Sequence, residues 1–199
     1  MPRTKEQFKE IREKTRKIIL DSSLNLFAEK GFNGTSISDI AKKAEISKGL
    51  IYNYFESKTA IAEAIYGEIM EDFKNIMAPI YKVKDPYEKL QRLITDTIKY
   101  TSGKKDYWRM YISFMLQPAP IMFEDVFTPQ FFKKFFLEFE DIFKAAGVKD
   151  PRNEAYEFAA LLDGIQMHMI FMDNYYPLLD MHKHLLNKYS KEELSKKVK

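Results

Sequence analysis

Apolar residues recur along the chain with the three-to-four-residue spacing of amphipathic helices, and no strand-like alternation bounded by hairpin signals occurs. The apolar stripe of the first segment comprises Ile19, Leu20, Leu24, Phe27 and Ala28. Gly31 follows as a stop signal, so the pattern predicts a helix from about Phe8 to Lys30. Similar segments continue to the C-terminus, and the sequence therefore predicts an all-α protein.

Short hydroxyl side chains mark the starts of the next three predicted helices. Ser36 is expected to cap the second helix, with Asp39 reaching back in a capping box. Ser47 and Ser57 are expected to cap the third and fourth helices by accepting hydrogen bonds from amides that lack a helical partner. The third helix would end near Phe55.

Prolines divide the rest of the chain. The fourth predicted helix ends near Met77, before Pro79. Pro86, Pro129 and Pro151 each follow an Asp or Thr, a pairing typical of an N-cap and a first helical residue. The remaining predicted helices span residues 86–102, 105–116, 129–146 and 151–176, with short helices after Pro177 and from Lys191.

These elements predict a three-helix N-terminal head over residues 1–57 and a larger helical body over residues 58–199. With 45% hydrophobic and 31% charged residues, the chain is typical of a soluble globular protein. No apolar run approaches the roughly 18 residues of a membrane span, and no apolar leader segment is present. A cytoplasmic protein without a membrane partner is expected.

The net charge of +3 is small, but its distribution is informative. Residues 1–60 carry a net charge of +4 and the remainder carries −1. The positive excess thus lies in the predicted head, where attraction to phosphate groups would require it. The charge run from Lys5 to Lys17 could equally be a solvated helix face.

Enzymatic chemistry is not expected. His168, His182 and His184 are the only histidines, and the last two have a spacing that does not place them on one helix face for a metal. The sequence has no cysteine, Gly-rich phosphate loop or nucleophile elbow. We therefore expect no catalytic residue, no cofactor and no metal.

The third predicted helix combines features suited to reading DNA. Its buried face is supplied by Leu50, Ile51 and Phe55. Lys48, Tyr52 and Asn53 then face outward, and Gly49 leaves room for the backbone to approach a base. Asn53 suits the edge of adenine and Lys48 the acceptors of guanine. The spacing favours a helix-turn-helix over about residues 36–55 that enters the major groove.

Several of these residues occur together in one known family. They are the run Ile19–Phe32, Thr35-Ser36, Asp39-Ile-Ala41, the run Ser47–Phe55 and Lys58. Over about residues 12–72 the chain resembles the tetracycline-repressor (TetR) family. The resemblance implies a bacterial transcriptional regulator, usually a repressor and a homodimer, whose C-terminal body dimerises and binds a small ligand.

Carried over by position, the resemblance implies two sets of DNA contacts. The base-facing residues would be Lys48, Gly49, Tyr52 and Asn53, and the phosphate contacts Ser36, Ser47, Tyr54 and Lys58. One position departs from the family pattern, because Glu45 stands at the turn between the two helices where glycine is common. A residue with a Cβ there is expected to be strained or to shift the turn.

The body is rich in aromatic and Met side chains, for which a packed core is the simpler interpretation. The segment Ala159–Met172 is nevertheless apolar nearly all round, which predicts a helix covered on two sides, by a ligand cavity and by a second subunit. The predicted cavity lining is Trp108, Tyr111, Phe114, Met115, Phe135 and Met167, with Gln166 or His168 orienting the ligand. Taken alone, His168 is more typical of a core histidine.

The sequence thus predicts a DNA-binding transcriptional regulator, a repressor released by a small hydrophobic or aromatic effector. Its expected partners are double-stranded operator DNA, the effector and a second copy bound through the C-terminal helices. Two alternatives stay open: a helix-turn-helix protein that senses no small molecule, and a helical module that binds another protein.

Overall fold

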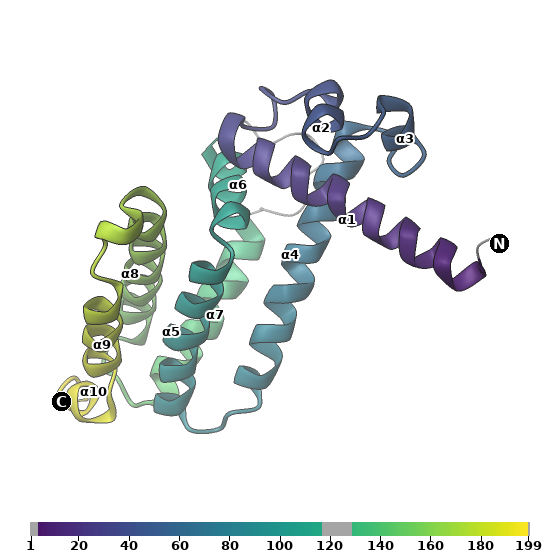
Figure 1. The fold of residues 1–199 in the computed structure, drawn as a ribbon. Coiled ribbons are helices and arrows are strands. Elements are labelled where there is room, and N and C mark those ends of the chain that lie inside the picture. The colour runs from purple at the N-terminus through teal and green to yellow at the C-terminus, as the bar shows by residue number, and fades with distance from the viewer. Residues whose placement is uncertain (1–3, 117–128, 199) are drawn as a thin grey trace. The chain divides into compact units, whose positions relative to one another are not determined.

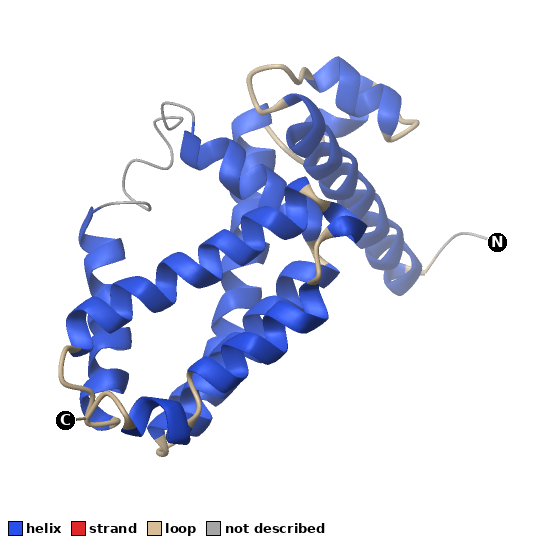
Figure 2. Cartoon of the chain, turned by 90° about the vertical axis from the view of Figure 1, so that its left-hand side faces the viewer, coloured by secondary structure: helices blue, strands red, loops and turns tan. Residues whose placement is uncertain are grey.

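The computed structural model describes residues 4–116 and 129–198, and every regular element in these ranges is a helix (Figures 1 and 2). The all-α prediction is therefore confirmed for the described residues. The chain divides into two compact units. The first comprises Met1–Glu71 and Asp106–Met122, and the second Asp72–Lys105 and Phe123–Lys199.

The first unit contains α1 (Lys5–Lys30), α2 (Ile37–Lys43), α3 (Lys48–Tyr52), the start of α4 (Lys58–Tyr81) and nearly all of α6 (Lys105–Leu116). Its fully buried side chains include Ile19, Phe27, Ile40, Ile51, Ile61 and Ile65. These residues come from α1 to α4, so the helix-turn-helix packs on one apolar core.

The start of α1 lies earlier than the sequence pattern predicts. Thr4 accepts a hydrogen bond from the backbone of Gln7, and the Gln7 side chain accepts one from the backbone of Thr4. This capping box starts the helix at Lys5, before the predicted Phe8. The prediction was wrong because it followed the apolar residues, whereas the helix begins with the polar and exposed Lys5, Glu6 and Gln7.

The three hydroxyl caps are confirmed. Ser36 and Asp39 form the capping box of α2, and the Ser47 hydroxyl accepts the Leu50 amide at the start of α3. The Ser57 hydroxyl accepts the amide of Ala60, three residues later, at the start of α4. The starts of α2, α3 and α4 are therefore each set by a hydrogen bond within a single turn of helix.

Three predicted helix ends are wrong, and the first is that of α3, which was expected near Phe55 and lies at Tyr52. The fourth helix was expected to stop before Pro79, yet α4 includes Pro79 and ends at Tyr81, where i to i+3 hydrogen bonds tighten the last turn. The helix predicted over residues 151–176 ends at Phe171. Asp173 has a φ of 47°, a left-handed conformation that stops α8, and the short helix η2 (Asp173–Tyr175) follows.

The second unit packs the rest of α4 with α5 (Pro86–Gly103), α7 (Pro129–Ala145), α8 (Pro151–Phe171), α9 (Leu178–Lys188) and α10 (Lys191–Ser195). Asp85 and Asp150 cap α5 and α8, as their position before a proline predicts. The residue that was expected to cap α7, Thr128, lies outside the described residues.

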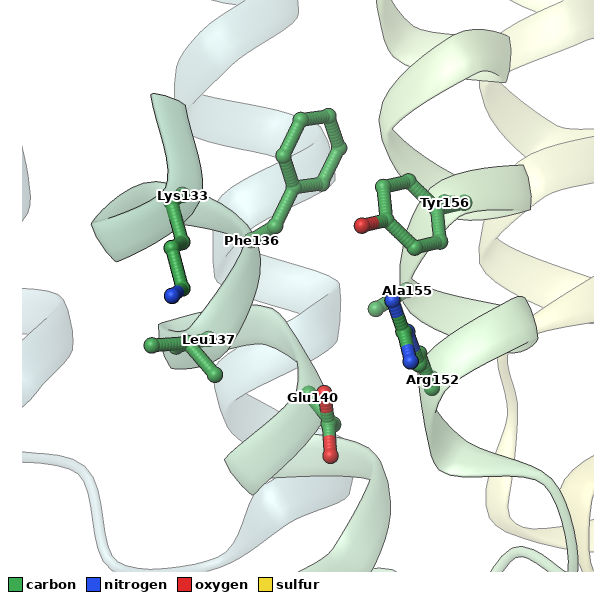
Figure 3. A pocket seen from close by; sticks show the side chains of 7 residues that line it. All are labelled: Lys133, Phe136, Leu137, Glu140, Arg152, Ala155 and Tyr156. Atoms are coloured by element: carbon green, nitrogen blue, oxygen red, sulfur yellow. The ribbon is translucent and has the colours of Figure 1, made fainter. Parts of the chain in front are cut away.

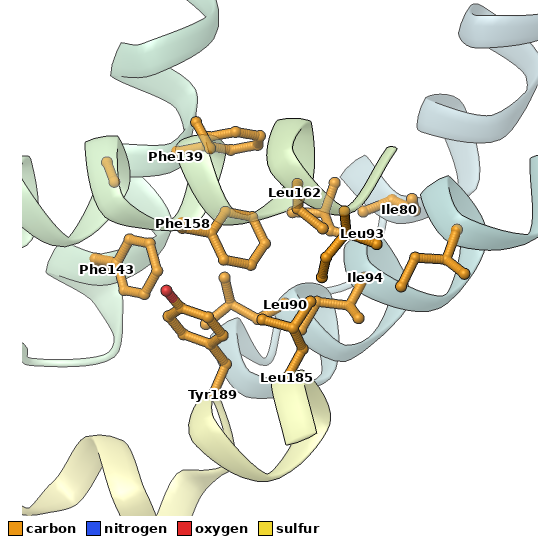
Figure 4. Packing of buried hydrophobic residues seen from close by; sticks show 14 of the residues in the cluster. Ile80, Leu90, Leu93, Ile94, Phe139, Phe143, Phe158, Leu162, Leu185 and Tyr189 are labelled. Carbon is orange, nitrogen blue, oxygen red and sulfur yellow. The ribbon is translucent and has the colours of Figure 1, made fainter. Parts of the chain in front are cut away.

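Aromatic rings form the centre of this unit (Figure 4). The Phe158 ring lies 5.2 Å from Phe139, 5.8 Å from Phe143 and 4.9 Å from Tyr189 between ring centroids. All three pairs meet at steep angles, the edge-to-face arrangement that aromatic pairs favour. These rings hold α7 and α8 together with the end of α9.

Candidate nucleic-acid interface and ligand site

The turn between α2 and α3 keeps a glycine-like geometry without a glycine. The Ile46 amide donates to the Ala41 carbonyl over 3.0 Å, and the Glu45 amide to the Lys42 carbonyl over 3.3 Å. This pair of hydrogen bonds is a Schellman motif, which places the residue after the cap in the left-handed region. Glu45 has a φ of 54°, so the expected strain is present, and it falls on a residue with a Cβ.

The outward face of α3 is open to solvent. Lys48, Gly49 and Asn53 are exposed, and 49% of the Tyr52 side chain is accessible, whereas Ile51 is fully buried. The four predicted base-facing residues therefore form one exposed surface. A Cβ added at Gly49 would meet no atom within 4 Å. Packing within the described chain thus gives no reason for a glycine at this position.

Ser36, a predicted phosphate contact, is exposed but already engaged. Its hydroxyl donates to the Asp39 carboxylate and accepts the Asp39 amide at 3.1 Å. The hydrogen bonds that the Ser36 hydroxyl and the Ser36 backbone amide donate to this carboxylate lower the pKa of Asp39. A phosphate at Ser36 would have to compete with this carboxylate, whereas Ser47, also exposed, retains its hydroxyl proton for an acceptor.

Lys58, at the start of α4, holds the segment between α1 and α2. Its ammonium group donates to the Phe32 carbonyl at 2.6 Å and the Thr35 carbonyl at 2.7 Å. It also lies 4.2 Å from the centroid of the Phe32 ring. Burial lowers the pKa of this amine. An ammonium group has three protons, so one donor is left for the phosphate contact that the resemblance implies.

Tyr54 and Phe55, which follow α3, contact cations of α1. Tyr54 is half-buried, and the guanidinium of Arg12 lies 5.1 Å from its ring centroid. Arg16 lies 5.5 Å from the Phe55 ring centroid and pairs with Glu68 at 3.2 Å. The cations of α1 thus reach the residues that follow α3.

The predicted effector pocket remains a prediction. Trp108 is half-buried, while the side chains of Tyr111, Phe114 and Met115 lie outside the described residues. These four residues belong to the first unit and the other four predicted lining residues to the second. Of the latter, Phe135 packs against Phe139, Gln166 is buried, and Met167 and His168 are exposed.

His168 was expected to be a core histidine, and this expectation is wrong. Its side chain is exposed, with its ring 5.5 Å from the ring of Tyr176. In the single chain α8 is covered on one side, and Tyr156, Met167 and Phe171 are exposed on the other. The predicted burial of this helix on two sides would therefore need a further molecule.

Sequence reasoning missed an opening of about 350 Å³ between α7 and α8 (Figure 3). It is lined by Lys133, Phe136, Leu137, Glu140, Arg152, Ala155 and Tyr156. The Phe136 and Tyr156 rings lie 4.6 Å apart, beside two exposed cations. This chemistry suits a flat, negatively charged group. No local pattern marks the site, because its residues come from two separate helices.

Among residues 4–116 and 129–198 no three His, Cys, Asp or Glu side chains are grouped as a metal site. None of the helices in these ranges combines the length and the hydrophobicity that a bilayer crossing requires.

Comparisons with known proteins agree with this geometry. Residues 19–65 match the family described as "Bacterial regulatory proteins, tetR family". An HTH-type transcriptional regulator of Bacillus subtilis, YuxN, is 53% identical over 45 residues, which cover 23% of this chain and 16% of YuxN. A second one, YvkB, is 27% identical over 166 residues, covering 79% of this chain and 84% of YvkB.

The fold recurs in solved structures. FadR from Bacillus subtilis, in complex with stearoyl-CoA, superposes with a TM-score of 0.66 at 20% identity, over 86% of this chain and 96% of FadR. The exposed recognition surface on α3 lies within the matched residues 19–65. The chain belongs to the tetR family of bacterial regulatory proteins and is a helix-turn-helix transcriptional regulator.

Proposed function

We propose that this regulator is a repressor that binds a palindromic operator as a homodimer and is released by a small hydrophobic effector. The observation that carries the proposal is the open face of α3, where Lys48, Gly49, Tyr52 and Asn53 are exposed together. This surface has cationic and hydrogen-bonding tips on a helix backed by the buried Ile51. Such a helix can enter the major groove and read base edges.

Each exposed group on α3 has a distinct part in the proposed contact. Asn53 can pair with adenine and Lys48 with guanine, each worth about 1–3 kcal/mol of discrimination when the geometry is good. Gly49 lets the backbone come close to a base edge or a methyl group. Tyr52 adds a large contact surface with a hydroxyl at its tip.

The dimer proposal rests on the exposed face of α8. Tyr156, Ala160, Met167 and Phe171 are spaced so that they share one side of the helix, and all four are exposed. Two residues that follow α8 in the chain, Tyr175 and Leu179, are exposed apolar side chains as well. Exposed apolar side chains that share one helix face mark an interaction site, and a second copy of the same face would cover them symmetrically.

An exposed side chain on this surface gives a direct test of the dimer. Phe171, 69% exposed, is expected to lie in the interface, so Phe171→Glu should convert the dimer to a monomer in light scattering coupled to size-exclusion chromatography. Phe8→Glu is the control, because Phe8 is 58% exposed on α1 in the other unit. A dimer that survives Phe171→Glu would argue against this face.

The effector proposal rests on the aromatic composition of the body and on the ligand of a structural relative. FadR, which shares the fold, holds stearoyl-CoA. A long acyl chain is a hydrophobic ligand of the class that the sequence favours. Release from DNA also requires that the effector bind the DNA-competent and DNA-free states with different affinity, because equal affinity shifts nothing.

Two measurements test the regulator proposal. Selection from a randomised duplex pool should yield a palindrome whose half-sites lie at least one helical turn, about 34 Å, apart. Stearoyl-CoA at saturation should raise the melting temperature and weaken binding to the selected duplex, with free coenzyme A as the control. A duplex selected without any ligand response would favour a regulator that senses no small molecule. Failure to select any sequence would favour a protein-binding module.

The proposal includes no catalytic step. It also places the protein in the cytoplasm, because an operator-binding regulator must meet chromosomal DNA.

A further inference from the structure

The first half of α1 extends beyond α2 and α3 as an exposed helix (Figure 1). Every residue from Thr4 to Lys14 is exposed. The segment also precedes residues 19–65, over which the chain matches its family. Neither the core of the unit nor the family match therefore explains why it is an ordered helix rich in charge.

Four cations of this helix gather on one side of it, which carries no acid, whereas the other side mixes acids with Lys14 and Lys17. Lys5, Lys9, Arg12 and Arg16 are spaced by four, three and four residues, which places them within an arc of about 60° on a helix of 3.6 residues per turn. The nearby acids lie outside this arc and are Glu6, Glu10 and Glu13. A merely solvated helix face would not need a side that carries cations alone. We call Lys5, Lys9 and Arg12 the basic stripe.

Arg12, at one end of the basic stripe, contacts Tyr54, which lies just after α3. Arg12 stacks over the Tyr54 ring, with its guanidinium 5.1 Å from the ring centroid. Tyr54 follows Asn53, the last of the exposed residues on the reading surface. The stripe therefore begins with Arg12 beside the exposed surface of α3 and runs along α1 to Lys5, away from that surface.

Two cations of the stripe are available for another anion. Lys5 and Arg12 form no ion pair with any carboxylate in the described part of the chain. Lys9 lies 3.9 Å from Glu13, with both side chains largely exposed, a contact that contributes little. Arg16 differs, because Glu68 already neutralises it.

The length of the stripe matches a run of phosphates. From Lys5 to Arg12 the helix rises about 10 Å, at 1.5 Å per residue. One strand of B-DNA carries a phosphate about every 3.4 Å along the duplex axis, so the stripe can span several of them. The stripe carries cations without the amide or hydroxyl tips that α3 offers to base edges, so it suits the sequence-independent phosphate contacts that position a protein on DNA.

We propose that the basic stripe binds DNA phosphates that flank the base pairs read by α3. This inference rests on the proposed operator binding and extends it by a second contact region. The occupant is duplex DNA, because the reading surface of α3 is continuous with the stripe through Tyr54 and Arg12.

A matched pair of variants separates the position of the charges from their number. Lys5→Gln/Arg12→Gln removes two cations from the stripe, and Lys14→Gln/Lys17→Gln removes two exposed cations from the other side of the same helix. Both variants have the same net charge. Arg12→Lys keeps the charge and removes the planar group stacked on Tyr54. Melting temperatures confirm that each variant is folded.

The probe is a duplex selected from a randomised pool, in a long form and in a form trimmed to the selected palindrome. Affinity for the long duplex is measured over a range of salt concentrations. Each lost phosphate contact accounts for about 0.9 units in the slope of log affinity against log salt. Lys5→Gln/Arg12→Gln removes two cations from each protomer, and so up to four contacts from the proposed dimer. We therefore expect the slope to become shallower by about two to four units. Lys14→Gln/Lys17→Gln and Arg12→Lys should each change it by less than about one unit.

The trimmed duplex gives the second readout. The stripe variant should bind it with the same affinity as the unaltered protein, because the flanking phosphates are missing. Equal slopes for the stripe variant and its matched control on the long duplex would overturn the inference and leave operator binding intact. If the unaltered protein selects no duplex, the proposed function fails, and the inference fails with it.

Discussion

The ammonium nitrogen of Lys58 lies 2.7 Å from the carbonyl oxygen of Thr35, so the first residue of α4 is tied to the residue just before the helix-turn-helix cap. A second hydrogen bond, to the Phe32 carbonyl, completes the link. Any movement of the start of α4 would therefore be passed directly to the segment that places α2 and α3.

Removing this link should loosen the head. Lys58→Met keeps much of the apolar stem but loses both hydrogen bonds. Hydrogen bonds to a charged group contribute about 1.5–3 kcal/mol each, but Lys58 is partly exposed and its burial carries a cost. We expect Lys58→Met to lower the free energy of unfolding, measured by urea denaturation, by about 1–2 kcal/mol. Lys42→Met, on an exposed lysine of α2, should change the midpoint little. An unaltered midpoint with a lower salt slope for DNA binding would assign Lys58 to a phosphate alone.

Replacing Glu45, the left-handed residue of the turn between α2 and α3, should raise the stability rather than lower it. Glu45 has a φ of 54°, a conformation that glycine adopts without a Cβ clash. Glu45→Gly should therefore raise the free energy of unfolding by about 1 kcal/mol, while Glu45→Ala retains the clash and should not. Thermal unfolding of both variants checks this. Equal stability of the two would show that the turn carries no strain.

Gly49→Ala should separate folding from DNA binding. A Cβ at this position meets no atom within 4 Å, and alanine is the better helix former by about 1 kcal/mol. Stability should therefore stay equal or rise, while affinity for the selected duplex should fall, because the methyl group occupies space that a base edge would take. Retained affinity would mean that Gly49 does not approach DNA closely.

Asp163 predicts a pH dependence. Part of its side chain is exposed on α8, but neighbouring atoms desolvate the carboxyl group and raise its pKa above the ordinary value of 3.8. The folded state therefore favours the protonated form, and the contribution of Asp163 to stability is lost as the pH rises through the folded pKa. Asp163→Asn should be more stable than the unaltered protein at pH 7.

The advantage of Asp163→Asn should shrink as the pH falls toward 3.8, because the carboxyl group is then neutral in both states. Urea denaturation of both proteins between pH 4 and pH 8, in steps of ~1 pH unit, measures this difference in stability. Asp141→Asn, at an exposed carboxylate on α7, controls for the loss of one charge. A constant difference across the range would contradict the assignment.

How much of the fold could be predicted depended on how local its causes are. The caps at Ser36, Ser47 and Asp85 were predicted correctly because each acts within a single turn of helix. The end of α8 was not, because Asp173 adopts a left-handed conformation and pairs with Lys105, a residue far away in the sequence. A local pattern contains no sign of such a contact.

The same distinction applies to the site. The burial of Ile51 and the helical period were enough to predict that Tyr52 and Asn53 face outward. The hydrogen bonds from Lys58 to two carbonyl groups could not be predicted, because an ammonium group has no directional partner preference. The opening beside Phe136 depends on how α7 and α8 pack, which periodicity does not determine.

The central claim is that the exposed face of α3 reads DNA, and its most direct test is the affinity of Lys48→Ala/Tyr52→Ala for the selected duplex at fixed salt. Both side chains are exposed, so the melting temperature should stay nearly unchanged. The affinity should fall at least tenfold, or about 1.4 kcal/mol, while Lys14→Ala, on the far side of α1, leaves it unaltered. Unaltered affinity of the double variant in this titration would contradict the account.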